Sequence, residues 1–522
     1  INSIFFFFFK LRFIFNKMVL LIITISLFFG GWMLLKEESV NESNLPKPDV
    51  VTVWSMSSIV RDPNLALNES QNFQVSLLYE PLFLLDAKNK LIPNIAKSYN
   101  ISKNGTKISI TLDETRTFTD GSKITPNDIK RTISRLNILD SKYSKFTRNI
   151  KGSGEAKSGL DFFGITTSKN KITFNLITPN PFFLYSLAQP NTGIIPTSAL
   201  NEKNEIVSDV GSGSYTIKID AQTTNDATVF IPRDKSLQTF NILVKTQDQI
   251  NVADAKSNVD IVFGQASTAS KFTRINIPIL ASASWNIYVK NGDSPLADVK
   301  FREAILLALN TESYIDAYGS KAIKAINFSG ITVDSVLCSP NCKGNVVEAK
   351  KMIKKLFPDG NIPNVPIDIE DSELQKVLAA SAKKELADVG IPTTISVHEP
   401  ADWANVIARG EISLFRFRWV SEIPVSSDSL VDNFKASSSD NLSGVVDTKL
   451  ENDIENYETS TNFDNKLKSS KTLQERIKDL YLSKPIAQYV AGVSVYNRIN
   501  IPDFDCYGRL NINKISLAKT KN

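Results

Sequence analysis

The residues of this chain that could act as catalysts or metal ligands are few and scattered. His398 is the single histidine, and Glu399 is the only carboxylate directly beside it. The chain has no GxSxG nucleophile motif, no HExxH zinc motif and no phosphate-cradling loop. A lone histidine on a strand is usually packed or on the surface, and a zinc site needs four ligands. We therefore predict no enzymatic activity, no metal site and no cofactor.

A more informative group of ionisable residues lies around Trp419. Arg416 and Arg418 precede this tryptophan on a predicted buried strand over 412–419, and Glu422 follows it. A buried carboxylate is costly unless it is paired, so Glu422 requires either a cationic ligand group or an arginine partner. The arginines also alternate with Phe415 and Phe417, which is typical of a strand with one solvated face. Both interpretations of this strand remain open.

The composition is that of an ordinary globular protein. The chain has 522 residues, of which 42% are hydrophobic and 22% charged, enough for two or three domains with substantial cores. Lys and Arg number 60 against 55 Asp and Glu, but four of the basic residues lie within the first 36 positions. The remainder is nearly neutral, which argues against nucleic acid as a partner, because phosphate binding needs a clustered basic excess.

The basic residues near the start flank an apolar stretch. Residues 18–35 carry no charge, Lys17 and Lys36 border them, and Lys10 and Arg12 lie upstream. Eighteen apolar residues can span a bilayer and can also form the core of a signal peptide. The sequence therefore predicts a membrane anchor or a cleaved signal over 1–36, a polar linker with two prolines over 37–49, and an exported remainder.

The chain contains three cysteines, Cys338, Cys342 and Cys506. In an exported protein, the segment from Cys338 to Cys342 could close a small disulfide across a Pro-Asn turn. Free thiols are the alternative.

Residues 77–136 contain a series of local structural signals. Asn104-Gly105 and Asp120-Gly121 predict tight turns. Thr125 is a predicted N-cap, Pro126 takes the first helical position, and Asp128 completes a capping-box arrangement. Together they predict two strands, a turn and a capped helix.

This order of elements resembles the N-terminal region of family 5 extracellular solute-binding proteins, the oligopeptide and dipeptide receptors of ABC importers. The matching positions are Leu78-Tyr79-Glu80, Pro93, Ala96, Asn104-Gly105, Phe118, Asp120-Gly121, Thr125 and Asp128-Ile129. Residues 294–315, with Asp298 as a helix cap, resemble the start of the family's second lobe, and residues 390–424 resemble the segment that ends in Trp-x-x-Asp-Tyr.

The resemblance implies an α/β fold of two lobes that close over a ligand, the Venus-flytrap fold of periplasmic binding proteins. Lobe I is expected to span 50–275 and to be completed by 487–522, and lobe II to span 276–486. The implied function is capture of a peptide or similar small solute, in the periplasm or outside the cell. The partners are the membrane subunits of an ABC importer, and the protein is expected to be a monomer.

The resemblance also suggests ligand-binding residues. Glu422 stands where relatives bind the terminal ammonium of a peptide, and Arg416 where they bind ligand carboxylates. Trp419 and Trp403 are expected either to line the cleft or to fill the core. Trp54, Ser55 and Ser57 follow the first strand and are expected at the rim of the cleft, with a plain strand end as the alternative.

A second interpretation assigns the chain to a different functional class. Glu422 replaces the usual Asp, and Arg418 replaces a residue that is commonly small in relatives. These departures and the apolar segment over 1–36 also suit a membrane-tethered receptor or scaffold that kept the fold and lost transport.

Overall fold

The computed structural model describes residues 50–517, apart from 87, 139–142, 155–162, 219–226, 252–257, 265–271, 290–293, 326, 329–331, 337–343, 422, 501–502 and 513–514. Residues Asp49–Asn522 form one compact unit. The predicted anchor over 1–36 and linker over 37–49 lie outside the described residues, as do Cys338, Cys342 and Glu422.

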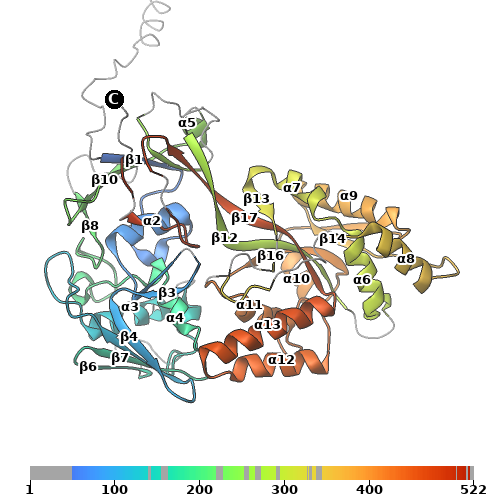
Figure 1. Cartoon of the computed structure of the whole chain (residues 1–522), viewed down its shortest axis with the longest axis horizontal. Coiled ribbons are helices and arrows are strands. Elements are labelled where there is room, and N and C mark those ends of the chain that lie inside the picture. Colours follow the sequence, from blue (N-terminus) through green and yellow to red (C-terminus); the bar gives the residue numbers. More distant parts are fainter. Residues whose placement is uncertain are drawn as a thin grey trace, which may run out of the picture. The chain divides into compact units, whose positions relative to one another are not determined.

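Helices and strands alternate along the chain, as predicted for an α/β protein (Figure 1). The α-helices are α2 (Glu69–Leu78), α3 (Pro126–Ile138), α4 (Phe183–Ser186), α5 (Gln247–Asn251), α6 (Val299–Ala308), α7 (Glu312–Tyr318), α8 (Val346–Leu356), α9 (Glu373–Asp388), α10 (Trp403–Ala408), α11 (Ser427–Phe434), α12 (Thr448–Thr459) and α13 (Phe463–Asp479). The 3-10 helices are η2 (Pro63–Leu65), η3 (Ser144–Phe146), η4 (Pro190–Thr192), η5 (Thr197–Ala199), η6 (Pro295–Ala297) and η7 (Gly319–Lys321).

The strands form three sheets in the described part of the chain. The largest has the order β15-β14-β16-β12-β17-β11-β1-β10-β9-β8, with β13 also paired to β17; a second pairs β2 with β3, and a third has the order β4-β5-β7-β6. Their bounds are β1 (Val50–Ser55), β2 (Phe83–Leu85), β3 (Leu91–Pro93), β4 (Ala96–Ile101), β5 (Lys107–Leu112), β6 (Ile165–Ser168), β7 (Lys171–Asn175), β8 (Tyr215–Lys218), β9 (Ala227–Pro232), β10 (Thr239–Val244), β11 (Ile261–Phe263), β12 (Phe272–Ile287), β13 (Ala322–Lys324), β14 (Ile367–Glu370), β15 (Ile395–His398), β16 (Leu414–Val420) and β17 (Ser483–Tyr496).

Two long strands at the centre of the large sheet connect its two halves. β12 and β17 run antiparallel and side by side (Figure 1). β17 also pairs with β11 of the first half, and β12 pairs with β16 of the second. The register between β12 and β17 shifts between Pro278 and Ser282, where Gln488 Nε2 donates a hydrogen bond of 2.9 Å to the carbonyl of Ala281. This irregularity lies close to the predicted lobe boundaries at 275 and 487, which stay predictions.

The helix caps predicted from the sequence are present in the structure. The backbone N–H of Thr125 donates to Asp128 Oδ2 at 2.9 Å, and the Thr125 hydroxyl donates to the same oxygen at 2.6 Å, which closes the capping box before α3. Asp298 accepts from the backbone N–H of Lys300 at 2.7 Å and caps α6. Gly121 has a φ of +87°, as the Asp-Gly turn requires.

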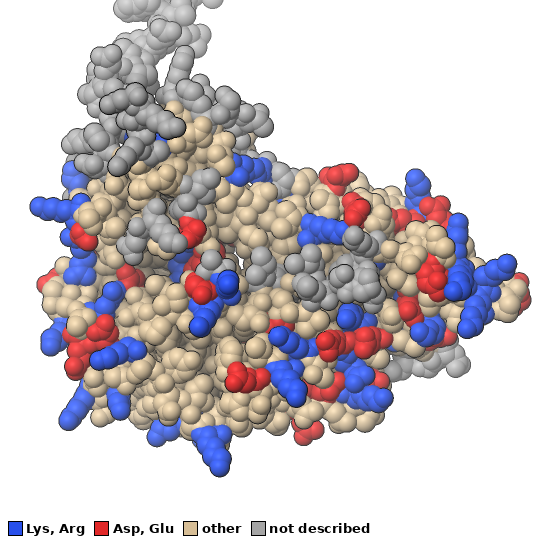
Figure 2. Space-filling view, viewed as in Figure 1, with Lys and Arg blue, Asp and Glu red and all other residues tan. Residues whose placement is uncertain are grey.

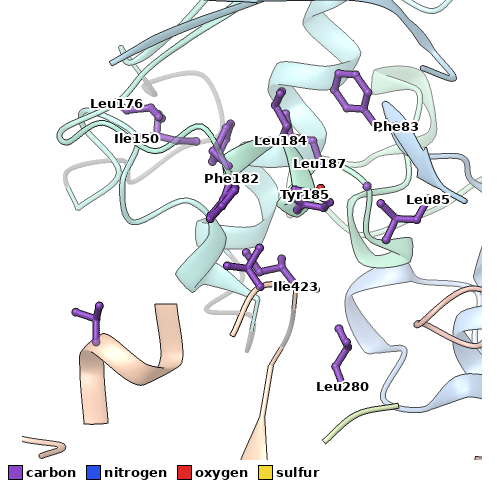
Figure 3. Packing of buried hydrophobic residues seen from close by; sticks show 14 of the residues in the cluster. Phe83, Leu85, Ile150, Leu176, Phe182, Leu184, Tyr185, Leu187, Leu280 and Ile423 are labelled. Atoms are coloured by element: carbon purple, nitrogen blue, oxygen red, sulfur yellow. The ribbon is translucent and has the colours of Figure 1, made fainter. Parts of the chain in front are cut away.

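The apolar core is divided into clusters. The largest brings side chains from 82–194 together with side chains from 406–482, so it connects segments far apart in the sequence. Figure 3 shows part of this cluster, in which Ile423 lies near Phe182 and Tyr185. Phe182 makes an edge contact with Phe463, with ring centroids 5.2 Å apart. This packing holds the segment around α4 against the region that contains α11, α12 and α13.

Charged groups of both signs are scattered over the face shown in Figure 2. Within the described ranges, no helix has the length and apolar character needed to cross a membrane.

Candidate functional site

A cleft of about 560 Å³ lies between the segment around α4 and the segment that follows β16. Its first wall includes Lys145, Phe146, Arg148, Asn149, Phe183 and Ser186. Its second wall includes Trp419, Ser421, Asp428, Ser429, Asp432 and Asn433. The walls are more than 200 residues apart in sequence, and their aromatic cluster brings them together. Small-molecule sites are typically clefts of about 300–1,000 Å³.

The second wall is built on a helix with an anchored N-terminus. Asp334 is fully buried, and its Oδ1 accepts from the backbone N–H of Ser426 at 2.8 Å. Its Oδ2 accepts from the backbone N–H of Ser427 at 3.1 Å and from the hydroxyl of Ser470 at 2.6 Å. A carboxylate at this position satisfies the N–H groups that the first turn of a helix leaves without partners. Asp334 therefore fixes the start of α11, which carries Asp428 and Asp432.

Asp428 accepts a hydrogen bond from a residue of α12. The hydroxyl of Tyr457 donates to Asp428 Oδ1 at 2.5 Å. Burial raises the pKa of Asp428, which the charge of nearby Lys466 and the Tyr457 hydrogen bond partly offset. Burial likewise lowers the pKa of Lys466, whose Nζ lies 4.1 Å from the centre of the Tyr457 ring.

Trp419 is both a core residue and part of the cleft. It is only 2% exposed, stacks on Phe434 at 5.8 Å between ring centroids, and donates its indole N–H to Ser284 Oγ. It also lines the cleft together with Arg418, whose guanidinium lies 4.9 Å from the centre of the Tyr489 ring. The two roles considered for Trp419 are thus compatible.

Arg416 points into a different environment. Its Nε donates to Gln375 Oε1 at 2.9 Å, and its Nη1 lies 3.3 Å from the Tyr318 hydroxyl and 3.2 Å from the Tyr489 hydroxyl. It does not line the 560 Å³ cleft. Glu422, for which an arginine was considered as a possible partner, lies outside the described residues.

The other predicted ligand-binding residues also lie away from this cleft. Trp403 contacts His398, with ring centroids 5.8 Å apart, and the ring of Trp54 has Lys245 Nζ 5.3 Å from its centre. Ser55 is fully buried and accepts from the hydroxyl of Ser70 at 2.6 Å, while Ser57 accepts from Asn68 Nδ2 at 2.9 Å. None of them lines the cleft.

Sequence reasoning missed Ser421, Asp428, Asp432 and Arg148. The spacing of the two aspartates, four residues apart just beyond Glu422, was a usable signal once a helix was placed over 427–434. Nothing in the sequence indicated that Arg148 faces them across the cleft.

Two further cavities lie elsewhere. One of about 960 Å³ is lined by Arg61, Asp62, Arg135 and neighbours from the first half of the chain. Another of about 740 Å³ is lined by the ion-paired Glu80 and Arg116 together with residues 503–505 and 509–512. No group of three or more His, Cys, Asp or Glu side chains in the described part of the chain is placed to hold a metal ion.

Known proteins resemble this chain in sequence and in fold. The glutathione-binding protein GsiB of Escherichia coli (strain K12) is 26% identical over 377 residues, which cover 67% of this chain and 69% of that protein. The unliganded open form of MppA, a periplasmic murein tripeptide-binding protein, has a TM-score of 0.79 at 16% identity and covers 91% of this chain and 98% of its own. A nickel ABC transporter structure from Bacillus halodurans has a TM-score of 0.74 at 16% identity and covers 90% and 99%.

These similarities confirm the predicted periplasmic-binding-protein fold. Residues 90–441, well over half of the chain, match the family described as "Bacterial extracellular solute-binding proteins, family 5 Middle". This match confirms the predicted function as the solute-binding component of an ABC importer, on the periplasmic or extracellular side, and the prediction that the protein is not an enzyme. The chain belongs to the bacterial extracellular solute-binding proteins of family 5.

Proposed function

We propose that this protein captures a short peptide in the cleft between the α4 segment and α11, and delivers it to an ABC importer. The observation that carries the proposal is the distribution of charge in the cleft. Lys145 and Arg148 lie on one wall, and Asp428 and Asp432 of α11 lie on the other, beside Arg418 of β16. A zwitterionic peptide has groups of both signs and so suits opposed walls of opposite charge.

Two of the relatives support a peptide as the cargo. GsiB is named as a glutathione-binding protein and MppA as a murein tripeptide-binding protein, and both ligands are small peptides. The cleft of about 560 Å³ has room for a ligand of that size.

We further propose that binding closes two lobes, with lobe I over 50–275 and 487–522 and lobe II over 276–486. The register shift between Pro278 and Ser282 supports a hinge on β12 and β17, because an interrupted strand ladder bends more easily than a regular one. Closure of this kind needs the ligand to bind the closed state better by about 5.5 kcal/mol to move a 1:99 equilibrium to 99:1.

Glu422 stands in the sequence between Ser421 and Ile423, which both line the cleft, and is proposed to contact the terminal ammonium of the peptide. Arg416 is proposed to act indirectly, since it hydrogen-bonds to Tyr489, whose ring lies against Arg418. Trp403, Trp54 and Ser57 are proposed only as residues of the outer rim, because they do not line this cleft. Ser55 is fully buried and is proposed to act through Ser57, whose backbone N–H donates to its Oγ at 2.9 Å.

The exported, membrane-attached state of the protein is part of the same proposal. The apolar residues 18–35 support a signal peptide or anchor, and 37–49 a linker long enough to separate it from the binding unit. A disulfide between Cys338 and Cys342 and a monomeric state are proposed on the sequence alone.

Native mass spectrometry of the full-length protein, purified in detergent and offered a tripeptide library, tests the peptide proposal. We expect one-to-one complexes with a subset of the library. If no library member binds and none raises the thermal midpoint, the peptide proposal is wrong.

A further inference from the structure

Helix α11 presents two carboxylates to the cleft. Asp428 and Asp432 are four residues apart on this helix, and both line the cleft. Residues at this spacing lie on the same helix face, with their Cβ atoms roughly 6 Å apart. Two carboxylates at that separation can bind one cationic group between them.

Neither carboxylate is neutralised by a neighbouring residue. Among the described residues, no lysine, arginine or histidine forms an ion pair with Asp428 or Asp432, although fifteen other ion pairs are described. Asp432 is exposed to solvent on one side, but its partial burial at the cleft is the main cause that raises its pKa, and the charges of Asp428 and Asp440 raise it further. Their mutual repulsion means that a bound cation would lower the free energy of this wall.

A second polar group in the cleft lacks a partner. Ser421 lines the cleft next to Trp419 and is only 6% exposed. Its Oγ is buried and has no hydrogen-bond partner in the described part of the chain, whereas its backbone N–H donates to the carbonyl of Leu280 at 2.8 Å. A buried hydroxyl without a hydrogen-bond partner is unfavourable, so this site is suited to a polar ligand group that bonds to it.

The charged groups that face the two aspartates come from both walls. Lys466 lies behind Asp428 and offsets part of its charge, and Arg148 on the opposite wall lowers the pKa of Asp432. Asp440 adds negative charge at the rim. Lys145 and Arg418 also line the cleft. The charged residues of α11 itself are both acidic, and no described basic residue forms an ion pair with either of them.

We propose that Asp428 and Asp432, together with the hydroxyl of Ser421, form a subsite for a basic side chain of the bound peptide. The ammonium of a lysine or the guanidinium of an arginine would lie between the two carboxylates. Both groups are hydrogen-bond donors only, which matches the acceptor oxygens that this wall supplies. The inference rests on the proposed peptide-binding function and extends it to a solute class, basic peptides.

Competition between two tripeptide libraries tests this subsite. In the first library each member contains one lysine, and in the second norleucine replaces that lysine, which keeps the length and removes the charge. Native mass spectrometry of the full-length protein measures the ratio of the two affinities. We expect wild type to favour the lysine library by at least about tenfold, since a hydrogen bond to a charged group contributes about 1.5–3 kcal/mol.

The double variant Asp428→Asn/Asp432→Asn should lose this preference, so that it binds the lysine and norleucine libraries with similar affinity. The single variant Asp432→Asn changes an exposed helix position and should lose part of the preference for the lysine library. It keeps the test usable if the double variant folds poorly. Asp388→Asn is the matched control, because Asp388 is an exposed aspartate on α9 that does not line the cleft. It should keep the full preference.

The outcomes separate the subsite from the function on which it rests. If wild type binds neither library, the peptide-binding proposal fails and the subsite with it. If wild type binds both libraries equally, or the double variant keeps the lysine preference, the subsite is wrong and peptide binding stands. If the double variant weakens both libraries by the same factor, the aspartates act on lobe closure and the subsite is also wrong.

Discussion

Tyr457 of α12 donates a hydrogen bond of 2.5 Å to Asp428 of α11, within the wall of the cleft. Burial raises the pKa of Tyr457 well above its ordinary value, so the phenol keeps its proton and remains a donor throughout the physiological range. This contact favours the charged, acceptor form of Asp428 and offsets part of the burial that raises its pKa.

The variant Tyr457→Phe should therefore raise the pKa of Asp428 still further and reduce the free energy of unfolding. We expect a loss of about 1.5–3 kcal/mol at pH 7.5 in urea denaturation, because the lost hydrogen bond has a charged acceptor. Tyr496→Phe is the control, since no described residue hydrogen-bonds to the Tyr496 phenol, and it should change stability by about 0.5 kcal/mol or less. Equal effects of the two substitutions would contradict this role for Tyr457.

Asp334 anchors the N-terminus of α11, and its removal should be costly. Asp334→Ala leaves two backbone N–H groups and the hydroxyls of Ser427 and Ser470 without their acceptor in a fully buried site. We expect a loss of about 3 kcal/mol in the free energy of unfolding, measured in urea. Asp334→Asn keeps the size and one acceptor oxygen, so it should lose less. An Asp334→Ala protein within about 1 kcal/mol of wild type would show that α11 is anchored by other contacts.

Lys484 should make stability depend on pH in the neutral to alkaline range. Its ammonium is 2% exposed and donates to the carbonyls of Leu306 at 2.7 Å and Leu309 at 2.5 Å, at the end of α6. Burial lowers its pKa to about 7 in the folded protein, whereas the unfolded chain titrates near 10.5. Between these values the unfolded state binds more protons, so the free energy of unfolding rises with pH.

Lys484→Met should remove this contribution. Between pH 7.5 and 9.5, wild type should gain about 2 kcal/mol more than the variant, measured by urea denaturation at each pH. Lys354→Met, at the end of α8 on an exposed side chain, should leave the slope unchanged. If the free energy of unfolding changes with pH in the same way for wild type and Lys484→Met, Lys484 does not have a lowered pKa in the folded protein.

Gly105 tests the contact between the β4–β5 turn and the connection between α12 and α13. It has a φ of +69° in the turn between β4 and β5, and a Cβ there would lie 2.7 Å from the carbonyl oxygen of Thr461. Gly121 has a similar φ of +87° but would place a Cβ within 4 Å of nothing. Both changes to alanine carry the backbone cost of about 1–2 kcal/mol, and only Gly105→Ala adds the clash.

We therefore expect Gly105→Ala to lose at least about 1 kcal/mol more than Gly121→Ala in the free energy of unfolding. Thermal and urea denaturation of both variants give the comparison. If the two variants lose the same free energy of unfolding, the turn and Thr461 can move apart without reducing stability.

The local parts of this structure could be predicted because each depends on neighbours in the sequence. The capping box of Thr125 and Asp128 and the cap at Asp298 are hydrogen bonds across two or three residues. The positive φ of Gly105 and Gly121 follows from their turns.

The cleft could not be predicted in the same way because it depends on contacts between distant segments. The sequence did not show that Arg416 hydrogen-bonds to Gln375, Tyr318 and Tyr489, and its role as a ligand contact stays a prediction. Arg148 faces Asp432 only because packing around Phe182 and Phe463 brings the walls together. Resemblance to a family placed the strand before Glu422 but did not extend to the helix after it.

A crystal structure of the full-length protein with a lysine-containing tripeptide from the library tests the central claim most directly. The account predicts that the peptide lies between Arg148 and α11, with the lysine ammonium within hydrogen-bond distance, about 3 Å, of Asp428 or Asp432. A peptide bound instead in the 740 Å³ cavity beside Glu80 and Arg116, or in the 960 Å³ cavity beside Asp62, would contradict it.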